Sequence, residues 1–309
     1  MRLLKWFTRI FAYLLYTLIV LGLMLWYQFP ADAAKTRLES ELHSFTPDLQ
    51  WKIGSIGLAL PADIRLNGIQ ISDSRGQKKP LLIIDSLFLR PDLRAYLQSK
   101  KMSAGYRLGA LDGRVSGRMI LADDHNSLRF DGSAGGIKIN GLQKILQELD
   151  RTVSGTLSGS FTGKGQVRAP GINELQGKVS LVKGEISFQK PVLGMKQLAF
   201  SQVSSRIKYE SGEIHFEGGR VESRLLAGEF SGTVTPVDSI ARSTLKVNGA
   251  LIPRPEFLSG IGNDMAVNLL KKQLQEGKLS FTINGPLKEP GIVFTGLPAD
   301  FNQRLQGGR

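Results

Sequence analysis

The side chains that could do chemistry are few and widely separated in this sequence. The histidines are His43, His125 and His215, and each lies in a different segment without a second ligand-type residue at metal-binding spacing. The chain has no cysteine, so thiolate zinc sites, iron–sulfur clusters and disulfides are not expected. We interpret the histidines as solvent-facing or structural, and we predict no metal and no cofactor.

Two further segments resemble catalytic motifs only superficially. Residues 159–165 (GSFTGKG) are one residue shorter than a phosphate-binding loop, and Gly165 stands where Ser or Thr would bind magnesium. The polar stretch from Asp123 to Asn126 is typical of a turn. There is no G-x-S-x-G nucleophile motif. The sequence therefore predicts that the protein is not an enzyme.

The longest apolar run extends from Ile10 to Tyr27 without a charge. As a helix it would be about 27 Å long, close to the ~30 Å hydrocarbon core of a bilayer. The basic residues Arg2, Lys5 and Arg9 precede it, which places the N-terminus in the cytoplasm and the rest of the chain across the membrane. The predicted anchor residues are Ile10, Leu14, Leu18, Leu21, Leu25 and Trp26.

A cleaved signal peptide is the alternative interpretation of this end. Ala31-Asp32-Ala33 provides a small-residue cleavage site after a basic start. However, the apolar run is longer than a usual signal core, and the site lies beyond Pro30. Both interpretations export the remainder of the chain.

The net charge of +13 limits the classes of partner. It favours anionic lipid headgroups or an acidic partner, although basic residues scattered along the chain also suit a solvated surface. Nucleic acid is not expected behind a membrane anchor. The predicted division is a cytoplasmic N-terminus (1–9), a transmembrane helix (10–27), a juxtamembrane helical linker (28–50) and a β-rich domain (51–309).

From Trp51 onward the apolar residues mostly alternate with polar ones, which predicts short antiparallel strands. Glycines and turn residues are interpreted as the breaks between them. Short helices are predicted at 31–45, 93–98, 142–151 and 257–275. The candidate apolar sheet face comprises Leu157, Phe161, Val167, Val179, Leu181, Leu279 and Phe281.

The predicted fold is therefore mainly β: a curved, repetitive antiparallel sheet with few short helices to cover its apolar face. Two arrangements would satisfy that face. The sheet could close on itself as a sandwich or barrel, or it could curve into a gutter whose lining contacts lipid chains or an apolar segment of a partner.

Several blocks of the sequence resemble a known family. They are YQFPADAAKTRLESEL (27–42), LNGIQISD (66–73), PLLIIDSLFLRPDLRAYLQSK (80–100), GTLSGSFTGKGQV (155–167), LQGKVSLVKGEISF (175–188) and KLSFTINGPLKEPGIVF (278–294). Together with a single N-terminal anchor, they are similar to protein N of the type II (general) secretion pathway, and to the wider AsmA-like group of periplasmic proteins.

The resemblance implies a single-pass inner-membrane protein of a Gram-negative bacterium with a periplasmic β-domain. Its partners would be the inner membrane and other subunits of the secretion system, in which it would be an accessory component. The AsmA-like relatives imply lipid binding or transfer instead. If the exported residues formed 25–30 short strands, a single sheet would extend about 120–145 Å at ~4.8 Å per strand, which makes spanning the periplasm alone doubtful.

Overall fold

The computed structural model describes residues 13, 16, 17, 20, 24, 29–59, 63–74, 80–124, 126–142, 146–149, 151–167, 171–192, 195–237, 239–260 and 277–295. The six predicted anchor residues all lie outside this set. Among the residues that are described, no helix is both long and apolar enough to cross a membrane.

A single antiparallel sheet of 15 strands forms most of the described structure. The first strands are β1 (Leu49–Lys52), β2 (Ser55–Ala59), β3 (Asp63–Asp73), β4 (Leu82–Pro91), β5 (Ser103–Ala110), β6 (Gly113–Leu121) and β7 (Ser127–Lys138). The others are β8 (Val153–Gln166), β9 (Gly171–Val192), β10 (Met195–Glu210), β11 (Glu213–Glu222), β12 (Leu226–Thr235), β13 (Thr244–Pro253), β14 (Leu279–Pro286) and β15 (Gly291–Phe294).

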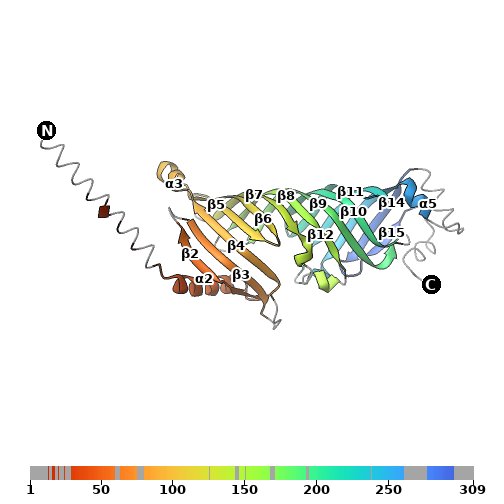
Figure 1. The fold of residues 1–309 in the computed structure, drawn as a ribbon. Coiled ribbons are helices and arrows are strands. Elements are labelled where there is room, and N and C mark those ends of the chain that lie inside the picture. The colour runs from red at the N-terminus through yellow and green to blue at the C-terminus, as the bar shows by residue number, and fades with distance from the viewer. Residues whose placement is uncertain are drawn as a thin grey trace.

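The strands are arranged almost in the order of the sequence. From β3 to β15 each strand pairs with the next, while β1 and β2 both pair with β3. Figure 1 shows the sheet extending along the molecule from β2 to β14 and β15. The mainly β, antiparallel architecture predicted from the sequence is confirmed.

The strands are fewer and longer than predicted. The estimate of 25–30 was wrong because it assumed strands of 5–6 residues, whereas β9 continues through Gly177 and Gly184 over 22 residues. Where a glycine does interrupt the ladder it forms a bulge: Gly155, with φ of 136°, lies at a register shift within β8 without ending the strand. At ~4.8 Å per strand, 15 strands extend roughly 65–70 Å.

The helices are short and lie outside the sheet. They are α2 (Ala31–Phe45), α3 (Leu93–Ser99) and α5 (Pro255–Gly260), with 3-10 turns η1 (Ile139–Leu142), η2 (Gln147–Leu149) and η3 (Ile240–Arg242). Helices α2 and α3 confirm the helices predicted at 31–45 and 93–98. Of the helix predicted over 142–151, the structure describes Leu142 at the end of η1, the α-helical residue Leu146, η2 and Arg151, and residues 261–275 of the last predicted helix are not described.

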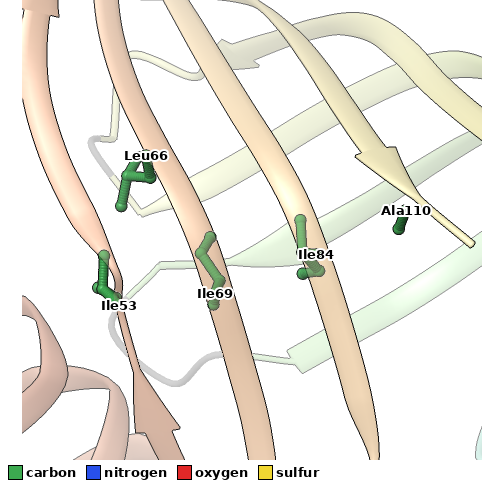
Figure 2. Packing of buried hydrophobic residues seen from close by; sticks show 5 residues of the cluster. All are labelled: Ile53, Leu66, Ile69, Ile84 and Ala110. Atoms are coloured by element: carbon green, nitrogen blue, oxygen red, sulfur yellow. The ribbon is translucent and has the colours of Figure 1, made fainter.

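Two apolar clusters lie near the two ends of the sheet. Figure 2 shows Ile53, Leu66, Ile69, Ile84 and Ala110 side by side on successive strands of the N-terminal end. Leu38 and Leu42 of α2 pack against this cluster, which explains the apolar spacing of that helix. The C-terminal cluster contains Phe257 of α5, Leu279 and Phe294. The middle of the sheet depends on neither cluster.

Candidate functional site: the apolar face of the sheet

One face of the sheet carries continuous rows of apolar side chains across many strands. Directly paired residues of antiparallel strands point to the same face. One such row runs through Ile137, Leu157, Leu181, Val203, Val221, Gly228, Leu251 and Leu279. A second runs through Tyr106, Gly117, Gly132, Phe161, Gly177, Ile207, Phe216, Gly232, Val247, Ile283 and Ile292.

The opposite face is polar along the same strands. Its rows include Ser158, Ser180, Ser204, Arg220, Glu229, Ala250 and Ser280. Ion pairs also lie there, such as Lys164 with Glu174 at 2.7 Å. The two faces therefore differ in chemistry over the whole middle of the sheet, and the period-two pattern of the sequence reflects this division.

Glycines on the apolar face leave space that aromatic rings of neighbouring strands occupy. Phe161 lies against Gly132, and its ring is 6.3 Å from that of Phe130 between ring centres. Phe130 in turn lies against Gly163. The Tyr106 hydroxyl reaches over Gly132 and donates a hydrogen bond to the Asp131 carbonyl at 3.1 Å, and burial raises the pKa of Tyr106. Alternating large residues and glycines thus shape this face.

The sheet closes around its apolar face towards the C-terminal end. A cavity of about 510 Å³ lies between residues of β8 and β9 on one side and residues of β13 to β15 on the other. Its apolar lining comes from Val153, Ile186, Phe188, Val192, Leu245, Ile283 and Ile292. Strands four or more positions apart in the sheet contribute to this one cavity at the C-terminal end. A larger cavity of about 980 Å³, over β8 to β13, is lined by residues of the polar face, among them Ser158, Ser204 and Glu229.

Arg151 connects the two sides of this cavity. Its Nη2 donates to the Lys288 carbonyl oxygen, 3.3 Å away and far along the sequence. Its Nε is buried without a hydrogen-bond partner among the described residues, and burial lowers the pKa of the guanidinium. The hairpin residues Val192 and Met195 also pack on the C-terminal cluster, so the closure rests on both polar and apolar contacts.

The structure brings most predicted face residues together on this surface. Leu157, Phe161, Val179, Leu181 and Phe281 lie on it and remain partly exposed. Leu279 differs, because it is only 2% exposed within the C-terminal cluster. Val167 was wrongly assigned to the strand: β8 ends at Gln166, and the Val167 side chain is 46% exposed.

Comparisons with models of protein families, with curated proteins and with solved structures found no match. The case for function therefore rests on the apolar face itself.

The histidines that the structure describes are not brought together with one another or into a group of three or more metal-ligand side chains. His43 lies at the end of α2, with Nδ1 3.0 Å from the Leu49 carbonyl oxygen, and His215 lies on β11, 3.8 Å from a Glu213 carboxylate oxygen. His125 lies outside the described residues. Sequence reasoning missed Val153, Ile186 and Ile283 as cavity residues, although their apolar type and alternation provided a signal; their convergence depends on the closure of the sheet.

Proposed function

We propose that the protein binds the acyl chains of lipids along the apolar face of its sheet, as an AsmA-like lipid-binding or lipid-transfer module. The observation that carries this proposal is the pair of rows of apolar residues and glycines in which Leu157 and Phe161, among others, remain partly exposed, while Val247 and Leu279 are buried. Side chains of an ordinary core would be buried by a second layer. Here α2 and α5 contribute to clusters near the two ends of the sheet instead.

The dimensions of the face suit a chain-like apolar ligand. The rows run across the strands for most of the roughly 65–70 Å of the sheet. The seven cavity residues named above supply apolar contact, and the polar groups at this end, such as Arg151, lie beside them. A cavity with an apolar lining and a polar group beside it matches the tail of an amphiphile.

The setting that we propose for this activity is the periplasmic side of the inner membrane, reached through a single N-terminal anchor. It rests on the uncharged run from Ile10 to Tyr27 and on the basic residues before it. A groove protein held at a membrane would take lipid from that membrane or return lipid to it.

The proposal is tested by photocrosslinking in intact cells. Phe161 is replaced by a photoreactive phenylalanine analogue, and Thr162, its exposed neighbour facing the other side of the strand, receives the same analogue as a matched control. We expect lipid adducts, identified by mass spectrometry, at position 161 and not at 162. Equal labelling at both positions, or no lipid at 161, contradicts the proposal.

A second variant separates a groove from a closed core. With Phe161→Asp in a partly exposed groove, the new carboxylate stays hydrated and the protein stays folded while losing lipid. In a closed core the same carboxylate would cost several kcal/mol, enough to unfold a domain with a stability of about 5–15 kcal/mol. Thermal unfolding of the variant beside Thr162→Asp distinguishes the two.

The second candidate function is an accessory role in type II protein secretion. Five of the six sequence blocks quoted above lie in the strands and loops of one sheet, and the block 80–100 also contains α3. The first block covers most of α2. This placement of all six blocks in one sheet and its helices is the observation that favours the role. In this role the apolar face would contact a partner subunit, so the analogue at Phe161 would yield protein adducts. Deletion of the gene would then reduce the amount of folded substrate protein in the medium.

A further inference from the structure

The most exposed apolar patch among the described β-domain residues lies on α3 and the residue that leads into β5. The side chain of Leu97 is 80% exposed, Leu93 is 51%, Tyr96 is 48% and Met102 is 47%. Single exposed apolar residues are ordinary, but four large ones within ten residues form a patch. Nothing in their own packing explains them, since α3 has no buried residue.

These side chains share one face of the helix. Leu93, Tyr96 and Leu97 are spaced i, i+3 and i+4, which places them as neighbours on a helical surface. The helix is fixed in position: the Asp92 side chain caps it by accepting a hydrogen bond from the Ala95 amide at 3.0 Å. At the other end Lys100 adopts a left-handed conformation with φ of 53° and terminates the helix.

The charges around the patch are predominantly basic. Arg94, Lys100 and Lys101 form no ion pair within the described part of the chain. The nearby acids are already engaged. Arg90 holds Asp63 through two nitrogen atoms, and Arg118 Nη2 lies 2.6 Å from the Asp92 carboxylate. Three basic side chains beside an apolar helical face therefore remain available to an anionic partner.

The position of α3 in the molecule is consistent with contact between this helix and a membrane surface. Figure 1 shows α3 at the same end of the molecule as β2 and α2, the helix that begins at Ala31. This is the end of the β-domain at which the chain enters the sheet. The patch also contains an aromatic residue, Tyr96, and tyrosines are enriched at the interface between lipid and water.

We propose that the exposed face of α3 inserts into the interfacial layer of a bilayer that contains anionic lipids. Leu93, Tyr96 and Leu97 enter the boundary between headgroups and acyl chains, while Arg94, Lys100 and Lys101 contact the phosphates. Short amphipathic elements with leucine and aromatic residues on one side and basic residues beside them bind membranes in this way. The inference stands whether or not the sheet holds lipid.

The experiment exploits the absence of cysteine from the chain. A single Leu97→Cys variant of the full chain carries a polarity-sensitive fluorophore, and Met102→Cys provides a second position in the patch. Ser280→Cys, at an exposed position on the polar face of β14, is the matched control. Each protein is reconstituted in vesicles of phosphatidylcholine, with or without phosphatidylglycerol.

We expect a blue shift, and quenching by a lipid-attached quencher, at positions 97 and 102 but not at 280. Both signals increase with phosphatidylglycerol and decrease with salt or in the Lys100→Glu/Lys101→Glu variant. Circular dichroism establishes that every variant is folded. Signals at 97 and 102 that equal those at 280 overturn the proposal. So does a blue shift that develops without vesicles as the protein concentration rises, since it would identify the patch as a protein contact.

Discussion

The ring of Phe281 lies directly against Gly249, its partner on the neighbouring strand. Its Cζ is 2.5 Å from the point that a Cβ at Gly249 would occupy, and the Glu229 carbonyl oxygen is 2.4 Å from the same point. The same relationship joins Phe230 to Gly219. Glycine is therefore required at these two positions because the ring on the neighbouring strand lies where a Cβ would be. It is not required by a left-handed backbone conformation at either position.

Substitution at Gly249 tests this relationship. Gly249→Ala places a methyl group against both the ring and the carbonyl oxygen, so we expect a loss of stability of about 1–3 kcal/mol. Gly135→Ala, also within a strand, is the control because a Cβ there meets nothing within 4 Å. Chemical denaturation measures both. Similar stabilities for the two variants would show that the ring does not need the glycine.

The ion pair between Asp63 and Arg90 predicts a pH dependence of stability. Hydrogen bonds from Arg90 hold the pKa of Asp63 below its ordinary value of 3.8. A lowered pKa stabilises the folded state above that value, and the stabilisation is lost as the pH falls below it. We expect Asp63→Asn to lower the melting temperature at pH 7, with the difference from the wild type shrinking between about pH 4 and pH 2.

The control for this prediction is a second aspartate. Asp112 pairs with Lys138 at 2.9 Å, but its side chain is 71% exposed. Asparagine tolerates its φ of 60° as well as aspartate does, so Asp112→Asn should change the melting temperature little at either pH. An equal effect of the two substitutions would contradict a special role for Asp63.

Filling the cavity tests the proposed lipid binding. Ile283 belongs to the second apolar row and lines the 510 Å³ cavity, so Ile283→Trp would occupy space that an acyl chain needs. We expect less co-purifying lipid by mass spectrometry, with Ser280→Trp on the polar face as the control. A folded Ile283→Trp protein that retains the lipid content of the wild type would show that the cavity does not hold the chain.

The predicted topology can be measured with the same cysteine-free chain. A cysteine at Ser280 should react with a membrane-impermeant maleimide in cells whose outer membrane alone is permeable. Reaction only after lysis of the inner membrane would contradict export. The N-terminal sequence of the mature protein then decides between an anchor and a cleaved signal, since cleavage after Ala33 would give a protein that begins at Ala34.

The sequence was informative wherever the structure depends on neighbouring residues. Alternation correctly placed Leu157 and Phe161 on one face, because strand period is a local property. It could not show that Gly132 lies beside Phe161, because pairing depends on register between strands. Strand length is likewise not a local property, and the strand count was too high because it assumed strands of 5–6 residues where β9 has 22.

The closure of the sheet around the cavity could not be predicted from the sequence either. It depends on contacts such as that between Arg151 and Lys288, whose residues are far apart in the chain and belong to no local pattern. The misassigned Val167 has a simpler cause. It continues the alternation of β8 by one position after the pairing has ended at Gln166, and alternation alone does not show where pairing stops.

The nearly sequential strand order has a consequence for how the protein is made. Since each strand from β3 onward pairs with the next, the sheet can assemble as a quasi-one-dimensional array, one hairpin at a time. The contact from Arg151 to Lys288 must wait until β14 has been added. The two sides of the cavity can therefore be joined by this contact only after the chain has been made as far as Lys288.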